Sequence, residues 1–131
     1  MKKPKILVTG STGFVGQQVM KALSLLVVDL SIIVRPEKVS FFQQNTSVKS
    51  IIISTDIFAE SSSWWKTHCL DVDIFIHLAW YAEPGKYLDS SKNEECFLGT
   101  VEIAKGLVEA GVKRFIGIGT CFEYKFSDLP L

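Results

Sequence analysis

The chain has 131 residues, of which 47% are hydrophobic and 11% aromatic, so it predicts one folded domain with a true core and excludes a disordered segment. Its 14 basic residues balance 14 acidic ones without a basic run, which predicts neither nucleic acid nor an anionic membrane surface as the main partner. The three cysteines are odd in number and widely spaced, which predicts reduced thiols in the cytoplasm, no disulfide framework and no metal site.

Short apolar runs alternate with helical patterns along the chain. The first run, at 6–8, is broken by Thr9-Gly10 and is too short for a signal peptide or a membrane span. The apolar runs predict strands at 5–9, 30–35, 48–54, 73–78 and 113–119. Apolar spacing and capping residues predict helices at 14–25, 61–68 and 90–110, and the segment 39–44 stays ambiguous, with a short helix as one reading.

Strands separated by helices are typical of βαβ units and a parallel sheet. Right-handed crossovers then favour an α/β fold of the doubly wound Rossmann type, with strand order 3-2-1-4-5. Ligands of such sheets bind beyond the carboxyl ends of the strands, where the strand order reverses. The sequence therefore directs attention to the residues that follow the first and fourth predicted strands.

Three glycines follow the first predicted strand at the spacing G-x-x-G-x-x-G. A sharp turn, a close approach to pyrophosphate and tight packing of a helix on the sheet each exclude a Cβ atom. The next helix points unpaired N–H groups and the positive end of its dipole at the phosphates. We therefore predict a dinucleotide-binding turn, and not an ordinary turn of small residues, over Gly10, Ser11, Thr12, Gly13, Phe14, Val15 and Gly16.

The end of the second predicted strand distinguishes NADP from NAD. An NAD site usually carries Asp or Glu at this place to bind the ribose hydroxyls. Here the sequence reads Val34-Arg35-Pro36, and Asp29 stands at the opposite end of the strand. The Arg35 guanidinium is suited to a 2′-phosphate, so NADP is favoured over NAD, with a solvated surface charge as the alternative for Arg35.

An ordered set of further motifs extends over the whole chain. These are T-G-x-x-G-x-x-G from Thr9, Thr55-Asp56-Ile57, His77-Leu78-Ala79, Gly99-Thr100, Gly111 to Phe115 and Gly119-Thr120. Together they resemble the extended short-chain dehydrogenase/reductases, the NAD-dependent epimerase/dehydratase family. The resemblance implies that residues 1–131 form the amino-terminal part of the dinucleotide-binding domain, through the fifth strand. The catalytic helix and substrate lobe of that family are absent from this sequence.

The resemblance also implies roles for residues at the ends of the third and fourth strands. Asp56 would accept a hydrogen bond from the adenine amino group beside Ile57, although an Asp here also caps the following turn in many loops. Three residues would line the pocket near the adenosine and pyrophosphate, namely Leu78, Ala79 and Trp80. Ordinary packing is the alternative for Trp80, and His77 is read as a packing residue at the strand end.

Thr120 is the catalytic position implied by the resemblance, as the residue that hydrogen-bonds the reacting oxygen. The family's proton exchange needs a Tyr-x-x-x-Lys pair on one helical face. The three tyrosines here are followed four residues later by Gly85, Ser91 and Asp128, so the motif does not occur. Where the family usually has Asn, this chain has Cys96, and Asn93 either replaces it from one turn earlier or the polar link is lost.

The resemblance implies the cofactor-binding part of a nucleotide-sugar epimerase, dehydratase or ketoreductase, which transfers hydride at a sugar carbon. The alternatives are a non-catalytic dinucleotide-binding module and an NADP-sensing regulatory protein. We expect no turnover by this chain alone, because the Tyr-Lys pair is missing. We also expect self-association through the side of the fifth strand, whose apolar residues 115–118 would form a sheet edge.

Overall fold

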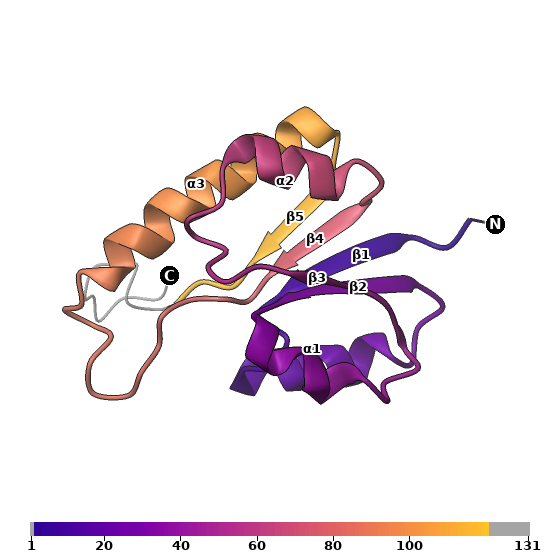
Figure 1. The fold of residues 1–131 in the computed structure, drawn as a ribbon, viewed down its shortest axis with the longest axis horizontal. Coiled ribbons are helices and arrows are strands. Elements are labelled where there is room, and N and C mark those ends of the chain that lie inside the picture. Colours follow the sequence, from indigo (N-terminus) through magenta and orange to yellow (C-terminus); the bar gives the residue numbers. More distant parts are fainter. Residues whose placement is uncertain (1, 121–131) are drawn as a thin grey trace, which may run out of the picture.

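The computed structural model describes residues 2–120 and contains one five-stranded parallel sheet. In Figure 1 this sheet lies between two layers of helices. Its strands are β1 (Lys5–Thr9), β2 (Asp29–Val34), β3 (Val48–Ile53), β4 (Ile74–His77) and β5 (Arg114–Gly117). They lie in the order β3-β2-β1-β4-β5, and each neighbouring pair is parallel. The predicted Rossmann-type fold and strand order are therefore confirmed.

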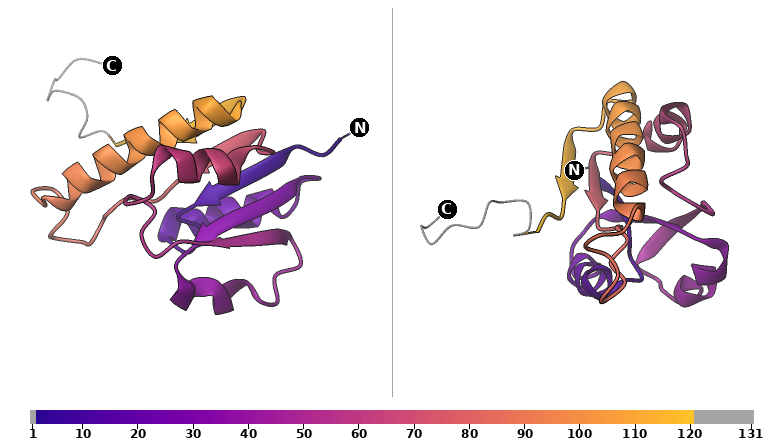
Figure 2. Two further views of the ribbon diagram at one scale, coloured as in Figure 1. Left: turned by 45° about the horizontal axis from the view of Figure 1, so that its top comes forward. Right: turned by 90° about the vertical axis from the view of Figure 1, so that its left-hand side faces the viewer.

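Helices cover both faces of this sheet, as the views in Figures 1 and 2 agree. One face carries α1 (Phe14–Leu23) and the 3₁₀ helix η1 (Pro36–Phe42), and the other carries α2 (Ser62–Cys69) and α3 (Lys92–Ala110). The first two connections between parallel strands cross one face of the sheet and the last two cross the other, which is the doubly wound arrangement. Within residues 2–120, no helix is both long and apolar enough to cross a membrane.

Two hydrophobic cores form, one on each face of the sheet. Alternate residues of β1 supply both, because Ile6 and Val8 pack with Met20 of α1 whereas Leu7 packs with Trp65 of α2 on the other face. This double burial explains why the strands read as continuous apolar runs and not as alternating patterns. Trp65 is fully buried, and Trp64 lies at the rim of the second core.

Helix ends follow the expected caps, with small shifts in their bounds. Ser61 Oγ accepts a hydrogen bond from the Trp64 amide at 3.2 Å and so caps α2, and Gly111 ends α3 with a left-handed φ of 79°. Helix α1 ends two residues before the predicted 25, because the amides beyond Ser24 turn back to nearer carbonyls in 3₁₀ fashion. The ambiguous segment is η1, which starts earlier because Pro36 occupies its first turn.

Candidate functional site

A cavity of about 530 Å³ opens at the carboxyl ends of β1 to β4. Its walls come from the turn after β1, the segments that follow β2, β3 and β4, and the first turn of α3. This is the place where the strand order reverses, which is where doubly wound sheets bind ligands. The volume lies in the ordinary range for small-molecule sites, so the fold presents one coherent candidate site here.

Two glycines of the turn are required by the protein's own packing. A Cβ on Gly10 would lie 2.6 Å from the Ala79 amide nitrogen, and Gly10 also has a left-handed φ of +71°. A Cβ on Gly16 would lie 1.9 Å from the Gly10 carbonyl oxygen. These contacts lock the start of α1 onto the turn and the turn onto β4. They explain the first and third glycines without any ligand.

Gly13 is different, because a Cβ there would meet only the Gly10 oxygen, at an ordinary distance of 3.5 Å. Its φ of −74° also suits any residue. The described part of the protein therefore gives no steric reason for glycine at this position. Gly13 lies on the cavity wall, so the missing side chain leaves room on the side from which a ligand would approach.

Hydrogen-bond donors converge on the same turn. Ser11 Oγ is buried, with the residue 1% exposed, and has no hydrogen-bond partner among the described residues. Helix α1 starts at the Gly13 N-cap, which has no side chain to satisfy the N–H groups of the first turn. An unpaired hydroxyl and a helix N-terminus in one glycine cradle match the donors that a phosphate accepts.

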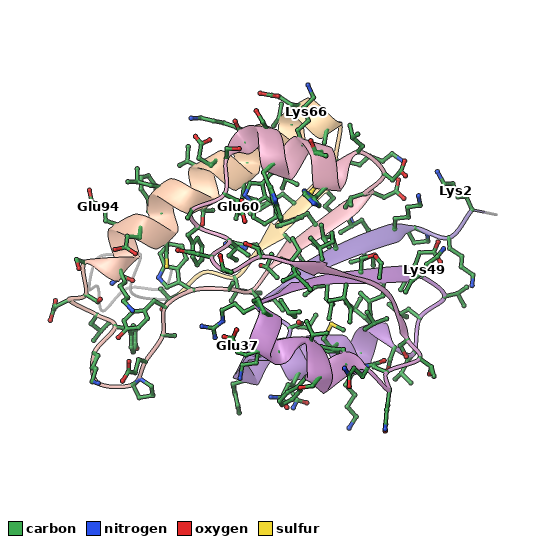
Figure 3. The ribbon with its side chains drawn as sticks, viewed as in Figure 1. Lys2, Glu37, Lys49, Glu60, Lys66 and Glu94 are labelled. Carbon is green, nitrogen blue, oxygen red and sulfur yellow. The ribbon has the colours of Figure 1, made fainter. Side chains whose placement is uncertain are left out.

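Two cations reach the cavity from the end of β2. Arg35 follows the strand directly, and Lys38 lies within η1, where its amide donates to the Arg35 carbonyl oxygen at 2.9 Å. The Arg35 Nε atom pairs with Glu37 Oε1 at 3.3 Å in an exposed ion pair. Glu37 lies at the start of η1 (Figure 3). Such a pair contributes little stability, so the guanidinium can exchange Glu37 for an anionic ligand.

The end of β3 supplies Asp56 and Ile57 to the cavity wall. Asp56 Oδ1 accepts a hydrogen bond from the Phe58 amide at 3.0 Å, so this carboxylate does cap the following turn. Within residues 2–120, Oδ2 of the same carboxylate accepts no hydrogen bond. Asp56 thus fixes the loop through Oδ1 and also lines the cavity, so the two alternatives for this residue are compatible.

Trp80 follows the end of β4 and lines the cavity, and two contacts fix the orientation of its ring. Its Nε1 donates to Asn93 Oδ1 at 2.8 Å, and its ring meets Phe58 edge to face with centroids 6.4 Å apart. Asn93 in turn donates through Nδ2 to the Tyr87 carbonyl oxygen. Asn93 therefore makes a polar link from the first turn of α3 to Trp80 and to the loop before the helix.

Cys96 on α3 also lines the cavity, although the residue is only 3% exposed. Burial raises the pKa of its thiol, and this effect exceeds the opposite effect of a hydrogen bond from the Tyr81 backbone. A thiol with a raised pKa is a poor nucleophile, so Cys96 acts as a small buried residue. Within residues 2–120, no group of His, Cys, Asp and Glu side chains could hold a metal ion.

The cavity brings together ten of the fourteen residues predicted for the site, and they come from all four strand ends. These are Gly10, Ser11, Thr12, Gly13, Arg35, Asp56, Ile57, Leu78, Ala79 and Trp80. Four others do not line it, namely Phe14, Val15, Gly16 and Thr120. Phe14 is 91% exposed on α1, and Thr120 is exposed beyond the end of β5. Tyr124, the tyrosine that is followed four residues later by Asp128, lies outside the described residues.

Several cavity residues were missed by the sequence reasoning. Of these, only Lys38 could have been predicted from the sequence, because it is a second cation three positions after Arg35. Four more belong to the loop after β4 and the start of α3: Tyr81, Glu83, Lys92 and Glu95. Lys92 Nζ lies 4.7 Å from the centroid of the Tyr81 ring, and the Tyr81 hydroxyl donates to Glu83 at 3.0 Å. No local sequence pattern predicts such a cluster, because the conformation of the loop determines which side chains come into contact.

With this geometry established, comparison with known proteins decides the family. The model of the NAD dependent epimerase/dehydratase family matches residues 6–128. This chain belongs to that family. It has the NAD-binding epimerase/reductase type of fold, and no curated protein matches it significantly.

Solved structures agree with this assignment of the epimerase/dehydratase chain. The oxidoreductase ylbE from Lactococcus lactis is 26% identical with a TM-score of 0.70, and the match covers 90% of this chain and 49% of that one. UDP-N-acetylglucosamine 4-epimerase from Bacillus cereus is 21% identical with a TM-score of 0.67, over 98% of this chain and 46% of that one. WbmG from Bordetella bronchiseptica, solved in complex with NAD, is 17% identical with a TM-score of 0.65, over 88% and 37%. The chain therefore spans less than half the length of these three structures.

Proposed function

We propose that this chain binds a nicotinamide dinucleotide in the cavity, with the pyrophosphate on the glycine turn. The observation that carries this proposal is the buried Ser11 hydroxyl, which lacks a partner in the described structure and lies in a glycine cradle at a helix N-terminus. An unsatisfied buried hydroxyl is costly, and a phosphate oxygen would satisfy it. Asp56, Ile57 and Trp80 would then enclose the adenosine end, and bound cofactor would supply the hydride chemistry of the family.

We further propose that NADP is preferred over NAD. Support comes from Arg35 and Lys38, which line the cavity at the end of β2, and from the lack of an acidic residue at the end of that strand. A 2′-phosphate would accept charge-assisted hydrogen bonds from both cations. Ribose hydroxyls alone would have no carboxylate to bind at this place.

Arg35→Ala and Lys38→Ala test this preference, with Arg114→Ala as a matched control at the opposite, amino-terminal end of the sheet. Titration calorimetry with NADP and NAD gives both affinities for each variant. We expect the first two variants to lose at least about tenfold in affinity for NADP and little for NAD, because a charged hydrogen bond contributes about 1.5–3 kcal/mol. Arg114→Ala should bind both as the wild type does. An equal loss for NADP and NAD contradicts the preference.

The broader proposal is that the chain represents the cofactor-binding part of a nucleotide-sugar epimerase, dehydratase or ketoreductase in the cytoplasm. Its reaction would couple hydride transfer at a sugar carbon with proton transfer at the attached oxygen, which Thr120 would hydrogen-bond. Because the sequence contains no Tyr-x-x-x-Lys motif, we expect binding without turnover. Absorbance at the reduced-nicotinamide band, with NADPH and 4-keto nucleotide sugars, tests this. Steady oxidation of NADPH would contradict it.

A further inference from the structure

His77 is the last residue of β4 and is buried beneath the cavity, at 6% exposure. Three phenyl rings surround its imidazole, those of Phe58, Phe75 and Phe115, with ring centroids 5.9–6.2 Å away. The sequence predicts an ordinary packing residue at this place. Its polar contacts give it a more specific role.

Both ring nitrogens of His77 make hydrogen bonds. Nδ1 lies 2.7 Å from Thr9 Oγ1 of β1, and Nε2 lies 3.2 Å from Thr100 Oγ1 of α3. Thr100 Oγ1 donates its hydrogen to the Cys96 carbonyl oxygen at 2.7 Å. A hydroxyl has one hydrogen, so Thr100 must accept from His77, and Nε2 carries the ring proton. Nδ1 is then the acceptor for the Thr9 hydroxyl, which assigns the tautomer.

This chain of hydrogen bonds joins two walls of the cavity. Thr9 immediately precedes Gly10, and its backbone carbonyl oxygen accepts a hydrogen bond from the Leu78 amide at 3.2 Å. Cys96 forms part of the opposite wall, on α3. The chain of bonds therefore runs from the residue before the glycine turn, through the His77 ring, to the helix that faces that turn.

We propose that His77, as the neutral Nε2–H tautomer, is a positioning residue that holds the glycine turn and the first turns of α3 at a fixed spacing across the cavity. This role rests on the proposed dinucleotide binding, since the spacing matters only for a ligand that touches both walls. The groups facing the ring within the described structure are hydroxyls and phenyl rings, with no carboxylate or cation. Burial accordingly lowers the pKa of His77 to about 4, which keeps the ring neutral.

The tautomer is tested directly by two-bond ¹H–¹⁵N correlation spectra of the wild-type chain near neutral pH. The sequence has two histidines, and His68 serves as an internal reference because its Nδ1 lies 2.8 Å from the Trp64 carbonyl oxygen and must donate. We expect opposite tautomers, with His77 protonated at Nε2 and His68 at Nδ1. His68→Gln assigns the signals. A His77 ring protonated at Nδ1, or at both nitrogens, overturns the proposal.

The positioning role is tested by Thr9→Val and Thr100→Val, which keep shape and remove one hydroxyl each. Thr67→Val is the matched control, because Thr67 on α2 also donates to the carbonyl four residues earlier but has no contact with His77. We expect the first two to weaken NADP binding about three- to tenfold, as for loss of one hydrogen bond, and the control to leave it unchanged. If one variant does not fold, the other carries the comparison.

The outcomes separate this role from the proposed function. If the wild-type chain binds NADP and the valine variants bind it equally well, the positioning role is refuted and the dinucleotide site is not. Wild-type chain that binds neither NADP nor NAD refutes the dinucleotide site, and the positioning role with it.

Discussion

Replacing Gly13 by Ala should lower the affinity for the dinucleotide without changing the stability of the fold. The new Cβ would lie 3.5 Å from the Gly10 oxygen, and the φ of −74° is allowed for Ala, so the folded chain has room for it. Stability gains about 0.4–1 kcal/mol from a stiffer unfolded chain and loses a similar amount because Ala is a poorer N-cap than Gly. We therefore expect almost no change in the free energy of unfolding.

Dinucleotide affinity should nevertheless fall at least about tenfold, because the methyl group displaces a phosphate from its donors and loses about 1.4 kcal/mol or more. Urea titration followed by far-UV circular dichroism measures the stability, and calorimetry with NADP measures the affinity. Gly16→Ala is the contrasting control, since its Cβ would lie 1.9 Å from a backbone oxygen and should destabilise the fold itself. If Gly13→Ala binds NADP as tightly as the wild type, the phosphate does not lie on this turn.

Three further predictions concern the fold around the site. Gly99→Ala should destabilise by about 1–2 kcal/mol, although Ala favours helices by about 1 kcal/mol, because its Cβ would lie 2.5 Å from Phe58 Cα. Ala104→Gly on the exposed face of α3 measures the difference in helix propensity between Ala and Gly in the same urea titrations. A Gly99→Ala variant more stable than the wild type would show that Phe58 moves away from the new Cβ at little cost. Stability should fall as the pH drops from about 6.5 to about 4, since the unfolded chain there binds a proton that the folded His77, with its lowered pKa, does not. His77→Gln should flatten that part of the urea-measured pH profile, and an unchanged profile would contradict the assignment. Finally, we propose self-association with a second copy through β5, where Phe115 and Ile116 are 44% and 39% exposed. Sedimentation at high concentration should show association that Ile116→Lys abolishes, and a clean wild-type monomer would refute it.

The fold was readable from the sequence because its signals are local. Apolar runs of strand length, Ser61 as a helix cap and Gly111 as a helix stop each act through neighbouring residues, and the order of the strands follows from the handedness of their connections. The bounds of α1 and η1 shifted by a few residues, since short-range turns compete at helix ends. Asp29 proved to be the first residue of β2, still at the end opposite to Arg35.

The residues of the site could be predicted from the sequence only where the end of a strand fixes their position. Gly10, Arg35, Asp56 and Ala79 lie at four different strand ends, and the parallel sheet gathers them by construction. The roles of His77 and of Trp80 were not readable. They depend on hydrogen bonds to residues 68 and 13 positions away in sequence, which only the packed structure brings within reach.

The central claim is that a nicotinamide dinucleotide lies at the carboxyl ends of β1 to β4. The most direct measurement is a titration of the ¹⁵N-labelled chain with NADP, followed residue by residue in ¹H–¹⁵N correlation spectra. We predict saturable shifts that concentrate at the amides of Gly10 to Gly13, Arg35, Asp56 and Ala79, with small changes at the amino ends of the strands. An unchanged spectrum at millimolar NADP, or shifts centred away from this cavity, would contradict the account.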